Sequence, residues 1–205
     1  MSLPTSDTTP PPKPAVFLDR DGTINQEVGY IRDLDNLTLI PGAAEAIRQL
    51  NQMGIPVVVV TNQSGVARGY YPESWMEQLH GRLKTLLAAE GAQLDGVYYC
   101  PHLPDGEVPE YSFDCDCRKP EPGMLEQAAK DLNLDLSHSF MIGDKATDID
   151  VGLRVGCKTI LLRSGYGEQV LKGEYQHIPQ SDYVFDSLIE SYEQILKPYF
   201  NQRLN

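Results

Sequence analysis

Residues 15–23 read Ala-Val-Phe-Leu-Asp-Arg-Asp-Gly-Thr, an apolar run that ends directly in two carboxylates and a glycine. Such a run is typical of a buried strand, and Asp-Gly is common in turns. Five further apolar runs follow along the chain, at residues 57–60, 97–99, 139–142, 159–162 and 183–185. Helical patterns separate or follow them, at residues 41–54, 72–91, 122–132, 146–155 and 187–196. The alternation predicts an α/β fold in which a doubly wound, mostly parallel sheet carries helices on both faces.

The length and composition favour one globular domain. The chain has 205 residues, of which 41% are hydrophobic, enough for a substantial core. We expect a single domain over residues 15–200. Residues 1–14 contain five prolines among serines and threonines, and we expect them to form a disordered tail.

The charge and the apolar segments limit the class of partner. The net charge of −12 argues against a nucleic-acid partner, because proteins that bind nucleic acids normally present a basic face to the phosphates. No segment approaches the ~20 consecutive apolar residues of a transmembrane helix, and residues 1–14 lack the apolar core of a secretory signal. We therefore expect a cytoplasmic protein without a membrane partner, and nothing in the sequence requires more than a monomer.

Polar and charged residues follow four of the predicted strands. Asp19 and Asp21 follow the first strand, Thr61 the second and Asp144 the fourth, and Lys119 ends the loop after the third. Each group alone fits an ordinary turn, but in a parallel sheet all of them would meet at the carboxyl edge, where ligands bind. Carboxylates there suit Mg²⁺, which prefers oxygen ligands, and a hydroxyl and an ammonium group suit the oxygens of a phosphate.

This set resembles the four motifs of the haloacid dehalogenase-like phosphohydrolases. The matching positions are Asp19-x-Asp21-Gly-Thr23, Thr61, Lys119 and Gly143-Asp144-x-x-x-Asp148. The resemblance implies a Rossmann-like sheet, and no insertion between the motifs is long enough for a large cap domain. It implies that Asp19 is the nucleophile that forms an aspartyl-phosphate, that Asp21 is the general acid and base, and that Thr61 and Lys119 hold the phosphate.

Two further assignments concern the metal and the last motif. The carboxylates of Asp19 and Asp144 are the expected Mg²⁺ ligands, and the resemblance adds the backbone carbonyl of Asp21. Asp148 has two interpretations. It orients Lys119 or a metal-bound water, or it is an acidic residue at a helix N-terminus.

Three of the four cysteines and one histidine are grouped in one predicted loop, residues 100–117. Cys100-Pro-His102 and Cys115-Asp-Cys117 provide three thiolates and one imidazole, a complete tetrahedral set for structural Zn²⁺. The alternative is a set of free core cysteines and a surface histidine. The residues between the two pairs are too polar to fold by burial alone, so a bound Zn²⁺ would order the loop and place Arg118 and Lys119 beside it.

The phosphatase motifs together with the zinc loop resemble the D-glycero-D-manno-heptose 1,7-bisphosphate 7-phosphatase family. The resemblance implies hydrolysis of the 7-phosphate of that small-molecule sugar bisphosphate. Beyond the Asp19–Asp21 motif, the implied substrate contacts are Glu27, Val28, Gly29, Tyr30, Thr61, Asn62, Gln63, Ser64, Arg118, Lys119 and Lys145. A second phosphate needs cations away from the reacting one, and Arg118 and Lys145 can supply them.

Three other functions compete with this hypothesis. Histidinol-phosphate phosphatase resembles the same family in both the motifs and the zinc loop. A non-catalytic phosphoacceptor module would use Asp19 without turnover, but the built-in hydrolytic base Asp21 speaks against it. A zinc-ribbon nucleic-acid binder conflicts with the net charge of −12 and lacks a basic stripe interleaved with aromatic residues.

Overall fold

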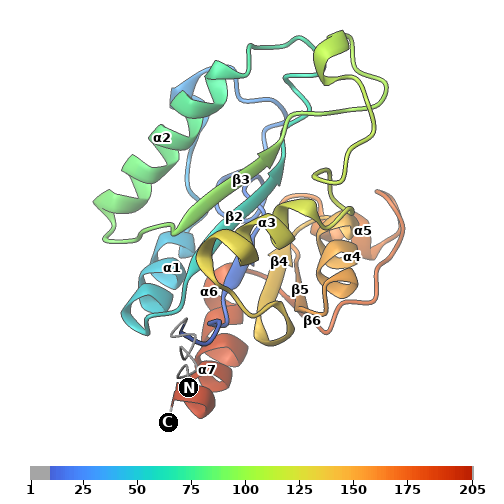
Figure 1. Cartoon of the computed structure of the whole chain (residues 1–205). Coiled ribbons are helices and arrows are strands. Elements are labelled where there is room, and N and C mark those ends of the chain that lie inside the picture. Colours follow the sequence, from blue (N-terminus) through green and yellow to red (C-terminus); the bar gives the residue numbers. More distant parts are fainter. Residues whose placement is uncertain (1–9, 205) are drawn as a thin grey trace, which may run out of the picture.

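Six parallel strands form one sheet at the centre of the molecule (Figure 1). The structure is a computed structural model that describes residues 10–204. The strand order is β3-β2-β1-β4-β5-β6, and every neighbouring pair is parallel. The strands are β1 Val16–Leu18, β2 Val57–Asn62, β3 Gly96–Cys100, β4 Phe140–Gly143, β5 Lys158–Leu162 and β6 Tyr183–Phe185. The predicted fold class is confirmed.

Helices cover both faces of the sheet. They are α1 Ala43–Gln52, α2 Ser74–Ala89, α3 Gly123–Leu132, α4 Ala146–Arg154, α5 Gly167–Leu171, α6 Leu188–Ser191 and α7 Lys197–Leu204, with a π-helical turn Tyr192–Leu196 between the last two. The first two and the last two pack on one face, and α3, α4 and α5 pack on the other (Figure 1). Within residues 10–204, no helix combines the length and the apolar character needed to cross a membrane.

The residues of the central strands alternate between two apolar cores. Val57 and Val59 pack in the core beneath α1 and α2, whereas Val58 and Val60 pack in the core beneath α3. All four are fully buried, which is why β2 is apolar throughout instead of alternating with polar residues. Because both faces are covered, the strands hold their carboxyl ends in fixed positions.

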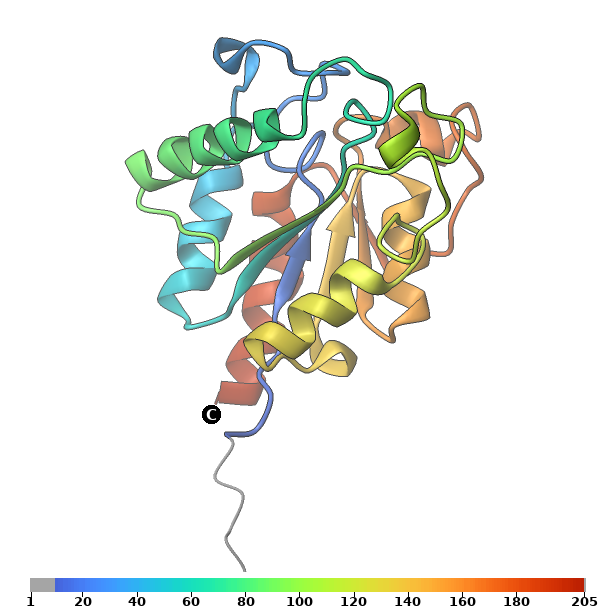
Figure 2. The same ribbon diagram turned by 45° about the horizontal axis from the view of Figure 1, so that its top comes forward.

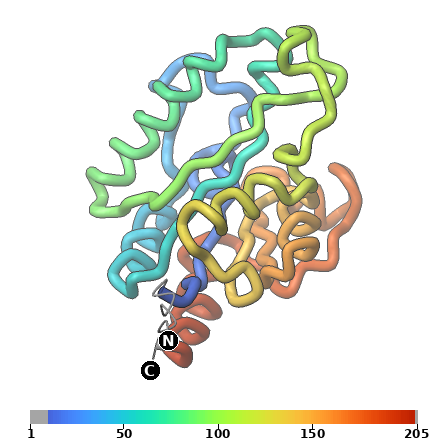
Figure 3. The backbone as a smooth tube through the Cα atoms, viewed as in Figure 1, coloured from blue at the N-terminus to red at the C-terminus, as the bar shows by residue number. Residues whose placement is uncertain are grey.

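The carboxyl ends of the strands meet at one edge, and the long loops lie beyond it (Figure 2). Residues 19–42 connect β1 to α1, and residues 101–122 connect β3 to α3. Figure 3 shows the second of these loops, in green, reaching well beyond the end of β3. Among the described residues, such loops and not a large cap domain surround this edge.

The structure differs from the sequence-based expectation mainly near the chain ends. The last helical segment continues past Leu196, because Phe200 still packs in the core. Residues 1–9 of the predicted tail lie outside the described residues. Residues 10–14 run beside the turn after α3, where the backbone of Lys13 donates to Asn133 at 3.0 Å and accepts from Asp135 at 2.8 Å. Lys13 therefore pairs with the turn after α3.

Candidate active site

Three side chains that are distant in the sequence meet at the carboxyl edge of the sheet. Asp19 follows β1, Thr61 lies near the end of β2, and Lys119 lies in the loop before α3. All three are buried and line one cavity of about 420 Å³, together with Asp21. The four residues predicted to be catalytic thus share one site.

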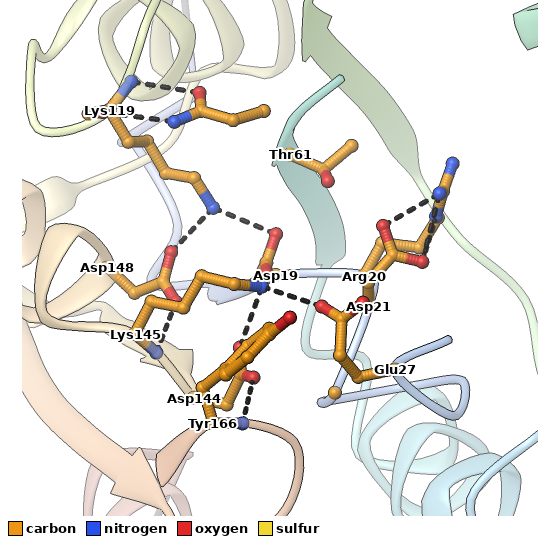
Figure 4. A network of polar contacts seen from close by, with 12 residues as sticks. Asp19, Arg20, Asp21, Glu27, Thr61, Lys119, Asp144, Lys145, Asp148 and Tyr166 are labelled. Carbon is orange, nitrogen blue, oxygen red and sulfur yellow. Dashed lines mark hydrogen bonds and ion pairs between the residues drawn. The ribbon is translucent and has the colours of Figure 1, made fainter. Parts of the chain in front are cut away.

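The ammonium group of Lys119 lies between the carboxylates of Asp19 and Asp148 (Figure 4). Its Nζ is 2.9 Å from Asp19 Oδ1, 2.6 Å from Asp148 Oδ1 and 2.6 Å from the backbone oxygen of Val60, so all three of its donors are used. Burial opposes the charge, but Asp148 and Asp19 raise the pKa of Lys119. In the same way burial opposes ionisation of Asp19, but Lys119 and Lys145 lower its pKa to about 2. The site therefore holds an ionised carboxylate against a fixed cation.

Asp148 contacts Lys119 and also lies at the N-terminus of α4, so both of the positions considered for it in the sequence analysis are present in the structure. One oxygen, Oδ1, pairs with Lys119, and the other, Oδ2, accepts a hydrogen bond of 3.0 Å from the backbone N–H of Lys145 at the start of α4. A carboxylate is favourable at a helix N-terminus. The start of α4 and the orientation of Lys119 thus depend on one side chain.

Lys145 lies among three carboxylates on the other side of Asp19. Its Nζ is 3.1 Å from Glu27 Oε2, 3.3 Å from Asp144 Oδ1 and 3.6 Å from Asp19 Oδ2. Burial opposes the charge, but these carboxylates raise the pKa of Lys145. Asp19 therefore has a cation on each side.

The carboxylates of the site fit a divalent cation. Oxygen atoms of Asp19, Asp144 and Asp148 lie within 4.8 Å of one another. Together with Glu27 these are four carboxylates, and among the described side chains they form ion pairs with two ammonium groups, those of Lys119 and Lys145, so negative charge is in excess in this cluster. Burial raises the pKa of Asp144 to about 8 against the attraction of Lys145, and the neighbouring carboxylates add to the rise. Oxygen donors with excess negative charge are the ligands that Mg²⁺ prefers.

Two glycines allow Asp144 to pack tightly between loops. Gly22 and Gly165 have φ of +81° and +55°, and a Cβ atom at either position would collide with the Asp144 carboxylate. Asp144 Oδ2 also accepts a hydrogen bond of 2.8 Å from the backbone N–H of Tyr166. Backbone atoms of two separate loops thus determine where this carboxylate lies.

Asp21 is held by donors from three residues. Arg20 Nη2 donates to its two carboxylate oxygens at 2.9 and 2.7 Å, Asn25 Nδ2 donates to Oδ1 at 2.9 Å, and Gln63 Nε2 donates to Oδ2 at 2.9 Å. In Figure 4 the Asp21 carboxylate is turned toward Arg20 and away from Lys119. Charge-assisted hydrogen bonds of this kind are strong, so Asp21 has a defined resting position.

Arg20, which holds Asp21, is also in contact with His80 of α2. No sequence motif had indicated a role for His80. His80 Nε2 is 3.3 Å from Arg20 Nη1, and the two side chains are 7% and 1% exposed. Burial and the nearby guanidinium lower the pKa of His80 to about 3. The neutral ring can then accept a hydrogen bond from Arg20. A single histidine within a helix carries no signal that would have singled it out.

Residues 61–64 line the cavity, and two of them, Asn62 and Gln63, also form hydrogen bonds with other residues of the site. The amide of Asn62 forms two hydrogen bonds with the backbone of Lys119, both 3.0 Å long. Gln63 Nε2 donates to Thr61 Oγ1 at 2.9 Å, which leaves the hydroxyl hydrogen of Thr61 available to a ligand.

Every predicted substrate contact except Val28 lines the cavity. The lining residues from that set are Glu27, Gly29, Tyr30, Thr61, Asn62, Gln63, Ser64, Arg118, Lys119 and Lys145. The side chain of Val28 is 53% exposed. Five residues without a predicted role also line the cavity: Pro120, Thr147, Tyr166, Tyr175 and Gln176.

The four predicted zinc ligands come together in the loop between β3 and α3. Cys115 Sγ lies 3.5 Å from Cys100 Sγ and 3.2 Å from Cys117 Sγ, and His102 Nδ1 lies 3.2 Å from Cys117 Sγ and 3.6 Å from Cys100 Sγ. A tetrahedral zinc site with Zn–S bonds of about 2.3 Å separates its sulfur atoms by about 3.8 Å, so the cluster fits Zn²⁺ after small shifts. Arg118 Nη1 donates to the backbone oxygen of His102 at 2.9 Å, which links the cluster to the cavity.

Comparisons with known proteins agree with this fold. A model of the haloacid dehalogenase-like hydrolases matches residues 16–81, and an HAD-hydrolase-like model matches residues 116–191. The D-glycero-D-manno-heptose-1,7-bisphosphate 7-phosphatase of Thermosynechococcus vestitus is 53% identical over 188 residues, covering 90% of this chain and 96% of that protein. The D-glycero-beta-D-manno-heptose-1,7-bisphosphate 7-phosphatase of Escherichia coli K12 is 49% identical over 154 residues, covering 74% and 80%.

A solved structure extends the agreement to three dimensions. The D,D-heptose 1,7-bisphosphate phosphatase of B. bronchiseptica, complexed with magnesium and phosphate, has a TM-score of 0.80 and 32% identity, covering 90% of this chain and 99% of that one. The fold has the arrangement of a haloacid dehalogenase-like hydrolase. The chain belongs to this family and, within it, to the family of D-glycero-D-manno-heptose-1,7-bisphosphate 7-phosphatases, which confirms the resemblance found in the sequence.

The buried, neutral His80 predicts a pH dependence of stability. Its pKa in the folded protein is about 3, against an ordinary value of 6.5, because of burial and the charge of Arg20, with a smaller contribution from Lys84 and an opposing one from Asp21. The unfolded chain therefore binds a proton that the folded chain excludes, so the free energy of unfolding falls as the pH drops from 6.5 toward 3.

Urea unfolding at pH 7.5, 6 and 5 checks this prediction. The variant His80→Gln, which keeps an acceptor for Arg20, should lose less stability on acidification than the wild type. The matched control His177→Gln changes an exposed histidine paired with Asp150 and should retain the wild-type slope. Equal slopes for wild type and His80→Gln would contradict a neutral buried ring.

Proposed function

We propose that the protein hydrolyses the 7-phosphate of D-glycero-D-manno-heptose 1,7-bisphosphate through a phosphorylated Asp19. The observation that carries this proposal is the buried, ionised carboxylate of Asp19 in the cavity, between Lys119 and Lys145. The substrate is supported by the relatives, two of which are named as phosphatases for this sugar bisphosphate.

The reaction takes place in two steps. The carboxylate of Asp19 attacks the phosphorus, and the bond between the phosphorus and the C7 oxygen breaks. Asp21 in its protonated form gives its proton to the departing oxygen. As a carboxylate it then takes a proton from the water that attacks the phosphorylated Asp19, which releases phosphate and restores the enzyme.

The remaining residues bind and orient the phosphate. The positive charge of Lys119 attracts its oxygens and the Thr61 hydroxyl donates a hydrogen bond to one of them, so the phosphorus stays in line with Asp19. Mg²⁺ at Asp19, Asp144 and the backbone carbonyl of Asp21 would offset the repulsion between a carboxylate and a phosphate, which is on the order of 4 kcal/mol for unit charges ~4 Å apart at an effective dielectric constant near 20. The related structure complexed with magnesium and phosphate supports this assignment.

The second phosphate and the sugar bind farther out in the cavity. The guanidinium of Arg118 can bind phosphate oxygens in a bidentate manner, and its contact with His102 holds it in place. Residues 27–30 form the part of the wall next to Lys145, through the contact of that lysine with Glu27.

We also propose that Zn²⁺ bound by Cys100, His102, Cys115 and Cys117 has a structural role. With four protein ligands it has no open position for a substrate. We further propose that residues 15–200 form a single phosphatase domain, with the zinc loop at residues 100–117. The protein acts in the cytoplasm as a monomer. It has no nucleic-acid or membrane partner.

A phosphate-release assay tests the substrate. We expect kcat/KM for the heptose 1,7-bisphosphate to exceed that for histidinol phosphate by at least about 100-fold, because a site built to bond the groups of one substrate rejects a compound that lacks them. ³¹P NMR should show that the 7-phosphate is lost, and turnover should require Mg²⁺. A preference for histidinol phosphate would favour the alternative phosphatase, and release of no more than one phosphate per chain would favour a phosphoacceptor module.

Variants of the two motif aspartates test the mechanism. Asp19→Asn should abolish turnover, because the amide is not a nucleophile. Asp21→Asn should lower kcat by about 10²- to 10⁴-fold through loss of general acid–base catalysis. Asp105→Asn changes an exposed aspartate and is the matched control. Mass spectrometry of enzyme quenched during turnover should find phosphate on Asp19, and normal hydrolysis by Asp19→Asn would refute the mechanism.

Metal analysis tests the zinc loop. Protein purified without chelator should contain stoichiometric zinc, and Cys115→Ser should lose it, together with thermal stability and activity, because the loop that carries Arg118 and Lys119 loses its anchor. Cys157→Ser changes a buried cysteine outside the cluster and should keep the zinc. Absence of zinc from the wild type would overturn the assignment.

A further inference from the structure

Part of the cavity wall is formed by residues outside the four motifs. Tyr166, Tyr175 and Gln176, here called the tyrosine wall, come from the segment that connects β5 to β6. Thr147 of α4 lines the cavity beside them. No sequence motif falls in this segment, and neither the reaction steps nor the binding of the two phosphates uses it.

Specific contacts hold the tyrosine wall against the reaction centre. The rings of Tyr166 and Tyr175 stack with centroids 4.3 Å apart and planes 13° from parallel. Lys145 Nζ lies 5.3 Å from the centroid of Tyr166, whose backbone N–H binds Asp144. In Figure 4 the hydroxyl end of Tyr166 extends toward the middle of the cluster. The wall is therefore placed by the same groups that carry the chemistry.

Gln176 is held in a backbone conformation that it would rarely adopt on its own. Its φ is +59°, in the left-handed region that disfavours residues other than glycine, asparagine and aspartate. Its Oε1 accepts a hydrogen bond of 3.0 Å from the backbone N–H of Ala146, at the start of α4. Strained residues of this kind persist where surrounding contacts enforce them, and they are concentrated at ligand sites. The amide of Gln176 retains two N–H donors for a ligand.

The chemistry of the tyrosine wall differs from that of the rest of the cavity. It provides two phenol hydroxyls and an amide, with the hydroxyl of Thr147 beside them, and no charged side chain from its segment lines the cavity. The cations that suit phosphate lie elsewhere, at Arg118, Lys119 and Lys145. Neutral groups that both donate and accept hydrogen bonds suit neutral hydroxyls, and the volume of about 420 Å³ lies in the range of pockets that hold a whole small molecule.

We infer that Tyr166, Tyr175 and Gln176 bind the hydroxyl-bearing carbon chain of the substrate and so determine which phosphate esters the enzyme accepts. The inference rests on the proposed function only in taking this cavity as the phosphatase site. It assigns a role in specificity to a segment that carries none of the reacting groups. In a site without a large cap domain, such a wall is one way to distinguish a sugar phosphate from other esters.

The test compares esters that differ only in their hydroxyl groups. Glycerol 3-phosphate and propyl phosphate have the same three-carbon chain, and the heptose 1,7-bisphosphate is measured beside them. The variants are Tyr166→Phe, Tyr175→Phe and Gln176→Asn. The first two keep the ring stack, and the third keeps a residue that tolerates positive φ. Tyr183→Phe, on β6 away from the cavity, is the matched control.

Each variant should lower the ratio of kcat/KM for the hydroxylated ester to that for propyl phosphate by about 3- to 10-fold, chiefly through KM, because one hydrogen bond between neutral groups is lost. Tyr183→Phe should keep the wild-type ratio. Wild-type ratios in all three wall variants would overturn the inference, as would equal losses on both esters, which would indicate a merely structural role.

The assay also separates this inference from the proposed function. A wild-type enzyme that hydrolyses the two simple esters but not the heptose 1,7-bisphosphate would refute the proposed substrate. The ratio of glycerol 3-phosphate to propyl phosphate in the variants would still decide the role of the wall.

Discussion

Attraction between two ammonium groups, one buried and one partly buried, and the carboxylates around them holds the loops at the sheet edge together. Lys119 lies between Asp19 and Asp148, and Lys145 lies between Asp19 and Asp144. These residues come from the loops after β1 and β4, from the loop before α3 and from the first turn of α4. Removing one member would leave a buried charge without its partner, which costs several kcal/mol, about 3–5 in typical cases. Each loop therefore depends on the position of the others.

The same arrangement prepares the site for charge that appears only during the reaction. Groups that already point at the developing charge need no reorganisation when the substrate reacts. Other residues hold these groups in position. Asn62 forms hydrogen bonds with the backbone of Lys119. Arg20 donates hydrogen bonds to Asp21 and is itself in contact with His80 and Gln63. A change at His80 on α2 can thus reach the reacting groups through two contacts.

The cavity joins two kinds of surface. One is charged and comes from the motif residues together with Arg118, which donates a hydrogen bond to the backbone of His102. The other is neutral and comes from the segment after β5, including Tyr166. The charged part is suited to phosphate, whereas the neutral part is suited to hydroxyl groups. A fold without a large cap domain can in this way separate catalysis from the choice of substrate.

Local patterns were enough to predict the parallel sheet, its main helices and the motif residues. Short apolar runs indicate buried strands, and Asp19, with the other motif residues, is conspicuous because it follows one of them directly. The Cys/His cluster was equally visible, because its four residues lie close together in the chain. His80, Tyr175 and Gln176 have no such local signal: their places result from the packing of a helix and of a connecting segment against loops that are distant in the sequence. The extension of the last helix past Leu196 has a similar cause, because it follows from the burial of Phe200 in a core assembled from the whole chain.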